Sequence, residues 1–106
     1  MITVKARLDA DYSQLDMEGH AAFHPGNDIV CAGASAIVNA LAGWLLNSPD
    51  MVRGEPEIRL DSGHAHIAAR GGQAVHEAFK QALCGLCNIQ MAYPKNISLQ
   101  LLDCRR

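Results

Sequence analysis

The chain lacks a basic surface, and this excludes one large class of ligand. Nine lysines and arginines are set against eleven aspartates and glutamates, so the net charge is −2, and no basic stripe runs through the sequence. Proteins that bind nucleic acid directly gather positive charge against the phosphates. We therefore expect no direct nucleic-acid partner.

The sequence predicts no targeting segment, no membrane span and no second domain. Residues 1–12 contain no apolar stretch of signal-peptide length. The longest apolar run, residues 29–46, is interrupted by small and polar residues and falls just short of a typical span of about 20 residues. The 106 residues suit a single core. We expect one cytoplasmic domain, residues 1–106, that binds no membrane.

Motifs for a bound cofactor are missing as well. The sequence contains no glycine-rich nucleotide loop, no internal repeat and no low-complexity segment. Its hydrophobic fraction of 49% and charged fraction of 19% are typical of a compact globular protein rather than a disordered one. We expect a folded protein that works without a cofactor.

The hydrophobic periodicity predicts five strands and two helices. The strands are expected at residues 2–8, 14–20, 57–61, 64–70 and 97–101, and the helices at 29–46 and about 73–91. Residues 47–56 hold two prolines and a glycine and are predicted as a loop. The order β-β-α-β-β-α-β predicts an α+β fold in which a mixed or mostly antiparallel sheet packs against two helices.

The helix predicted over residues 29–46 is apolar on nearly every side. A helix without a polar face must be covered on more than one side. In a chain of this length the sheet and the second helix can cover only part of it. We expect a homodimer to cover the remainder.

A histidine and a cysteine flank a short loop ahead of this helix, and together they form a candidate active site. His20 ends the second predicted strand, and Cys31 falls in or near the first turn of the helix. Asn27 or Asp28 is a natural N-cap, because a short side-chain oxygen accepts the unpaired amides of the first turn. The candidate substrate loop between them consists of Ala21, Ala22, Phe23, His24, Pro25, Gly26 and Asn27.

The pair predicts thiol chemistry. A helix N-terminus and a nearby imidazolium both favour a thiolate, which is the reactive form of cysteine. Cys31 would attack a carbonyl carbon, and His20 would take and return the proton. The oxyanion would lie against the amides at the helix start, from Ile29, Val30 and Ala32. Asp28 would either orient the imidazole or only cap the helix. The alternative is that Cys31 is a small buried hydrophobe, the usual role of a cysteine in an apolar helix.

The residues around this pair resemble those of a known family. Gly19-His20-Ala21, then Gly26-x-Asp28-Ile29-Val30-Cys31-Ala32 with Ser35 following, is similar to the bacterial ribosomal-processing cysteine protease family, called Prp. The similarity extends to the opening residues MITV, to Gly85-Leu86 and to Tyr93-Pro94.

The resemblance implies a small homodimeric cysteine protease. Such enzymes remove a short N-terminal extension from a protein of the large ribosomal subunit and cleave next to an aromatic-containing motif. The resemblance makes Cys31 the nucleophile, His20 its general base and Asp28 a supporting residue. The competing hypothesis from another class is a ribosome-associated binding protein that uses the same groove without turnover.

Two further thiols offer a different hypothesis. Cys84-x-x-Cys87 has the spacing of a redox pair or of half a zinc site. The pair falls late in a predicted helix, however, and no second Cys/His pair has matching spacing. We expect packing cysteines there, and we expect Cys104 near the C-terminus to be incidental.

Three histidines provide the remaining candidate ligands. His64 and His66 share one face of a predicted strand, and His76 begins the second helix. They could hold a metal ion. Same-face histidines on a hairpin more often form a solvated or hydrogen-bonded surface, so we expect no metal site.

Overall fold

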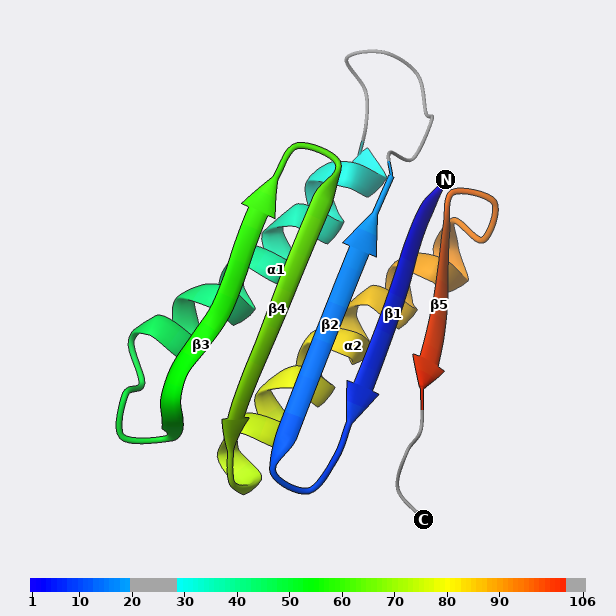
Figure 1. Ribbon diagram of the computed structural model, residues 1–106. Coiled ribbons are helices and arrows are strands. Elements are labelled where there is room, and N and C mark those ends of the chain that lie inside the picture. The colour runs from blue at the N-terminus through cyan, green and yellow to red at the C-terminus, as the bar shows by residue number, and fades with distance from the viewer. Residues whose placement is uncertain (20–28, 103–106) are drawn as a thin grey trace.

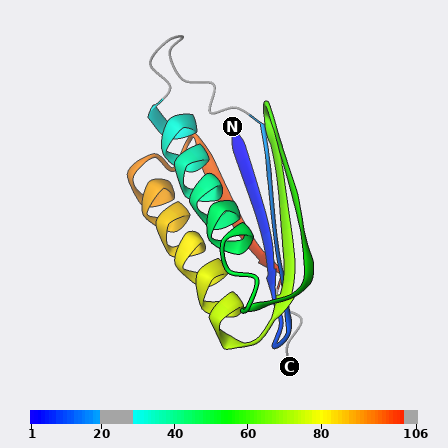
Figure 2. The same ribbon diagram turned by 90° about the vertical axis from the view of Figure 1, so that its left-hand side faces the viewer.

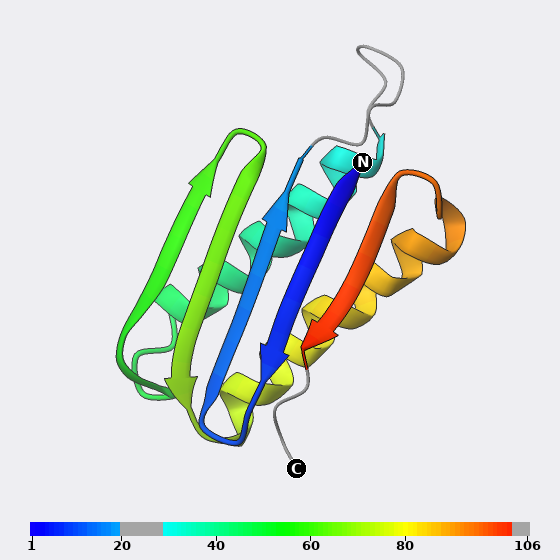
Figure 3. The same cartoon turned by 45° about the vertical axis from the view of Figure 1, so that its right-hand side comes forward.

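A computed structural model describes residues 1–19 and 29–102 of the chain. Within that part, five strands form one sheet in the order β3-β4-β2-β1-β5, with β3 and β5 at its edges (Figure 1; Figure 3). The elements are β1 (Ile2–Leu8), β2 (Tyr12–Glu18), α1 (Ile29–Leu46), β3 (Val52–Asp61), β4 (His64–Gly71), α2 (Gln73–Ala92) and β5 (Ile97–Leu102). Strand β5 runs parallel to β1, and the other neighbouring strands are antiparallel. The α+β fold and the predicted element order are confirmed.

Both helices pack on the same face of the sheet, which leaves its other face open (Figure 2). The alternation in β1 shows how the sequence produces these two faces. Val4 is buried beneath the helices together with Ile2 and Ala6, which lie two residues to either side of it. Lys5 and Arg7 lie on the open face. The largest buried side chains of the core are Phe79, Ile2, Leu15, Leu45, Ile67, Leu86 and Ile97.

Helix α1 is more apolar than its packing inside one chain requires. Its mean hydropathy is 1.9, and by length and composition it could cross a membrane, a test that a core helix also passes. Only 33% of the segment is buried. The buried residues include Ala34, Val38 and Leu45, which face the sheet and α2. A large apolar surface therefore remains uncovered along this helix.

Strand β3 starts earlier than the sequence predicts. Residues 52–56 were predicted to belong to a loop, but they form the first half of β3, because an edge strand tolerates both of its structure-breaking residues. Gly54 has φ +76°, a conformation that glycine adopts without a steric cost. Pro56 lies where the ladder with β4 is irregular, between Arg53 and Glu57, so its missing N–H is not needed there.

The predicted second strand was placed two residues too late. It was expected at residues 14–20, whereas β2 spans Tyr12–Glu18 and is followed directly by Gly19. The positive φ of Gly19, +97°, breaks the extended conformation at this point.

Candidate active site

Cys31 lies in the first turn of α1, where the apolar run was expected to start a helix. The side chain is half-buried and packs against the core. Val30 beside it is 1% exposed and anchors the turn, whereas Ile29 and Ala32 are exposed. Backbone N–H groups in the first turn of a helix have no acceptor within the helix. Cys31 therefore lies in the part of the helix whose N–H groups have no acceptor within the helix itself.

A hollow of about 420 Å³ opens at Cys31. One side consists of the ends of β1 and β2, a second side is the face of α1 that carries Cys31, and the third is the turn between β3 and β4. The lining residues are Ile2, Met17, Gly19, Cys31, Ser35, Val38, Asn39, Leu60, Asp61, Ser62, Gly63, His64 and Ala65. The hollow thus combines an apolar base with polar groups and a thiol.

Gly19 connects this hollow to the other half of the candidate pair. Its backbone N–H donates a hydrogen bond of 2.8 Å to the carbonyl oxygen of Gly63 in the β3–β4 turn. Gly19 immediately precedes His20 in the chain, so the backbone enters residue 20 from the rim of the hollow that Cys31 lines. His20, Asp28 and the predicted substrate loop, residues 21–27, lie outside the described residues.

Several lining residues escaped prediction from the sequence. Ser35 and Asn39 follow Cys31 at intervals of four, so all three share one face of α1. The side-chain amide of Asn39 donates a 2.8 Å hydrogen bond to the backbone oxygen of Ser35. The helical spacing could have identified these two residues. The β3–β4 turn could not be found this way, because only the sheet order brings it to α1.

The two other described thiols, Cys84 and Cys87, do not line this hollow. Cys84 and Cys87 were expected to pack in the core, but this prediction is wrong, because both lie on the exposed side of α2; neither forms a disulfide in the described part of the chain. Within residues 1–19 and 29–102, no group of three or more His, Cys, Asp or Glu side chains is arranged to hold a metal ion. Cys104 lies outside the described residues.

Two of the three histidines singled out by the sequence, His66 and His76, make hydrogen bonds. His66 Nδ1 lies 2.6 Å from Asp16 Oδ1, and His66 Nε2 lies 3.0 Å from Glu57 Oε1. His76 Nδ1 lies 3.3 Å from the backbone oxygen of Asp9, on a different element. His64 and His66 thus belong to the open face of the sheet, and His76 does not join them.

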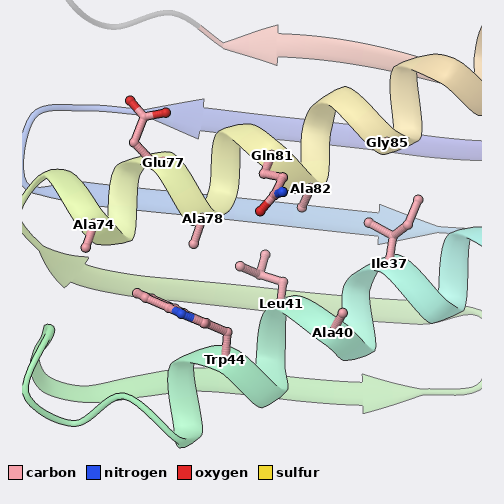
Figure 4. Close-up of a pocket in the computed structure, with 10 residues that line it drawn as sticks. All are labelled: Ile37, Ala40, Leu41, Trp44, Ala74, Glu77, Ala78, Gln81, Ala82 and Gly85. Atoms are coloured by element: carbon pink, nitrogen blue, oxygen red, sulfur yellow. The ribbon is translucent and has the colours of Figure 1, made fainter.

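A second, more apolar groove lies between the helices. It has a volume of about 520 Å³ and contains no nucleophile (Figure 4). Helix α1 lines the groove with Ile37, Ala40, Leu41 and Trp44, which lie opposite Ala78 and its neighbours on α2. The polar lining residues, Glu77 and Gln81, also belong to α2. This groove offers packing surface rather than chemistry, so the hollow at Cys31 is the candidate active site.

Comparison with known proteins identifies a cysteine protease family. Residues 1–98 match the family model described as cysteine protease Prp. The ribosomal processing cysteine protease Prp of Staphylococcus aureus, matched in two strains, is 33% identical over 108 residues, which covers 93% of this chain and 97% of the relative.

Solved structures give the same result. The crystal structure of the essential ribosomal processing protease Prp from S. aureus with a covalently linked product peptide has a TM-score of 0.83 at 29% identity, covering 96% of this chain and all of that one. The S. aureus Prp structure with a substrate peptide has a TM-score of 0.73 at 27% identity, with the same coverage. A protein of Streptococcus mutans, at 20% identity and a TM-score of 0.75, shares the fold. On the match to the family model and the relatives, this chain belongs to the cysteine protease Prp family.

Proposed function

We propose that this cysteine protease removes the N-terminal extension of a large-subunit ribosomal protein precursor. The observation that carries the proposal is the hollow that Cys31 shares with Gly19, the residue before His20. It joins a thiol at a helix start to the chain segment that carries the candidate base. The S. aureus relatives are ribosomal processing proteases, and two of their structures hold substrate or product peptides.

The residues suggest how the peptide bond would be broken. The sulfur of Cys31 attacks the scissile carbonyl carbon while His20 takes the thiol proton. First-turn amides, from among Ile29, Val30 and Ala32, stabilise the oxyanion. His20 returns the proton to the leaving amine, and water then hydrolyses the thioester. Asp28 orients the imidazole or caps the helix.

The function is tested by incubating the purified protein with the precursor of the large-subunit protein and measuring intact masses. A single cut that releases the extension supports the protease. A precursor that binds at unchanged mass supports the rival hypothesis of a ribosome-associated binding protein without turnover. We propose the cytoplasm as the compartment, because ribosomal proteins are made there and its reducing conditions keep thiols reactive.

The pairing of His20 with Cys31 predicts unequal reactivity among the thiols. Iodoacetamide is expected to alkylate Cys31 at least about tenfold faster than Cys84 or Cys87 near pH 7, since an activated thiolate is the nucleophile. Replacing His20 by Ala is expected to slow the alkylation of Cys31 and to leave the alkylation rates of Cys84 and Cys87 unchanged. Peptide mapping by mass spectrometry gives all rates in one sample. Equal rates at the three positions would contradict an activated Cys31.

We also propose that the enzyme is a homodimer formed through α1. The helix is strongly apolar, and only 33% of it is buried within one chain. Its exposed Ala40 and partly exposed Ile37 and Trp44 border the groove between the helices (Figure 4). An apolar surface of this kind is favoured to pack against a second copy of itself.

A charge in this groove is therefore expected to separate the protomers. Ala40→Glu should shift the mass at about 10 µM from dimer to monomer, since an unpaired carboxylate would be buried in the interface. Sedimentation velocity measures the mass. Gln100→Glu, at an exposed position of β5, introduces the same charge elsewhere and should leave the dimer intact. A monomeric wild-type protein, or a dimer that tolerates Ala40→Glu, would refute this interface.

A further inference from the structure

The wall of the hollow opposite α1 is a hairpin whose outer strand is paired on one side. Residues 60–65, the end of β3 with the following turn and the start of β4, form this wall. Strand β4 is paired on both sides, with β2 and β3. Among the described residues β3 is an edge strand, and its ladder with β4 is interrupted between Arg53 and Glu57. The part of β3 that reaches the hollow therefore depends on what holds it after this break.

A side-chain bridge crosses the sheet where the pairing resumes. Glu57 is the first residue of β3 paired after the irregularity. Its carboxylate lies 3.0 Å from Nε2 of His66 on β4, and Nδ1 of the same ring lies 2.6 Å from Asp16 on β2. One imidazole thus joins the edge strand, through β4, to the centre of the sheet.

The bridge is fixed at its inner end. The second carboxylate oxygen of Asp16 accepts a 2.7 Å hydrogen bond from the amide nitrogen of Gln14, whose amide oxygen accepts one of 2.9 Å from the Tyr12 hydroxyl. Arg70 stacks over the Tyr12 ring, 5.0 Å from its centroid. Asp16 is therefore held in position, while Glu57, whose side chain is 70% exposed, depends on the imidazole.

Both contacts are charge-assisted hydrogen bonds when the ring is protonated. A neutral imidazole carries one N–H, so it can donate to only one of two carboxylates, whereas the imidazolium donates to both. The hydrogen bonds to Asp16 and to Glu57 raise the pKa of His66 above its ordinary value. Protonated His66 therefore stabilises the folded sheet. This stabilisation is complete below the pKa of the histidine in the unfolded chain, about 6.5, and is lost as the pH rises through the higher pKa of His66 in the folded protein.

Other charges on the open face also bear on this ring. Arg59 is the register partner of His66 on β3, and His64 precedes it by two residues on β4. Across β2, Lys5 of β1 is paired with Asp16, and Glu18 is paired with His64. Asp61 of β3 also faces His64. Only Asp16 and Glu57 lie within hydrogen-bond distance of the His66 ring among the described residues.

We propose that Asp16, His66 and Glu57 form a pH-dependent clasp that keeps the β3 wall of the hollow in position for the substrate peptide. The proposal rests on the proposed function of the hollow. In this role His66 is a positioning residue, since it lies on the open face of the sheet and acts on the peptide through β3. Loss of the ring proton releases Glu57, and the wall at Leu60 and Asp61 loosens.

The test measures peptide binding without catalysis. In the Cys31→Ala background, the Kd of a fluorescent synthetic peptide with the sequence of the precursor extension is measured by anisotropy from pH 6 to pH 9. The Kd is expected to rise about two- to fivefold, which is the scale of a partly exposed charged contact. Adding His66→Gln should raise the Kd at pH 6 by a similar factor and remove that part of the pH dependence.

Two further variants separate charge from structure. Adding His76→Gln removes a histidine of α2 and should leave the profile of the background unchanged. Adding His66→Arg restores a permanent charge, and it should keep tight binding at pH 9. Identical profiles with and without His66→Gln would overturn the clasp.

Hydrogen exchange of the unliganded protein separates this proposal from the proposed function. At pH 6 the amides of residues 57–61 should exchange faster in His66→Gln than in the wild type, and the difference should vanish by pH 9, after correction for intrinsic rates. If no peptide binds at any pH, the proposed function fails, and the exchange result still decides the clasp. Equal exchange at pH 6 would overturn it.

Discussion

Cys31→Ala is expected to abolish cleavage of the precursor extension while the protein still binds it. The kcat/KM should fall by about 10⁴-fold or more, the scale seen when a protease loses its nucleophile. No other described thiol can substitute, because Cys84 and Cys87 are exposed on α2 and the hollow is lined by neither. Intact-mass measurement of the precursor over time gives the rate, and anisotropy gives the Kd of the peptide.

The fold should survive this substitution. Cys31 is only half-buried, so removing its sulfur leaves a small space beside the hollow rather than a cavity in the core. We expect a loss of about 1 kcal/mol or less in the free energy of unfolding. Cys84→Ala, which removes an exposed thiol from the other helix, is the matched control and should cleave at the wild-type rate. Unchanged processing by Cys31→Ala would rule out the cysteine mechanism.

Much of the fold could be predicted because local patterns determine it. The run from Ile29 to Leu46 is too long for a strand and too apolar for a surface helix, and α1 has these bounds. The alternation around Val4 and Ile67 places both residues in the core, as expected. Prediction failed at residues 52–56, where the edge of the sheet accepts a glycine and a proline that would break a central strand.

The site was less predictable because it depends on the order of the strands. A helix start and a cysteine can be recognised locally, but strand order brings the turn at Ser62 and Gly63 beside α1. The bridge from Asp16 to His66 joins residues 50 positions apart, so no spacing rule could detect it. The spacing of His64 and His66 suggests metal ligands, whereas in the sheet His66 is paired with Asp16 on β2 and lies 3.0 Å from the Glu57 carboxylate on β3.

Gly19→Ala is expected to disable the site, although it replaces only a hydrogen by a methyl group. Gly19 has φ +97°, which costs an alanine about 1–2 kcal/mol. A Cβ at this position would also collide with the backbone oxygen of Met1, and a backbone atom at the start of β1 cannot rotate away as a side chain can. We expect a loss of about 2–4 kcal/mol in the free energy of unfolding, measured by urea denaturation.

Activity should fall with it, because relieving the collision moves the chain that leads to His20. Moving Gly19 also strains its hydrogen bond to Gly63 at the wall of the hollow. We expect kcat/KM to fall at least about tenfold at a temperature where the variant is still folded, since small displacements of a catalytic group are costly.

Gly54→Ala is the matched control: Gly54 also has a positive φ, +76°, but nothing lies within 4 Å of its added Cβ. That variant should lose about 1 kcal/mol of stability and keep its kcat/KM. Equal losses of activity in the two variants would show that the close approach of Gly19 to Met1 is not needed to position the site.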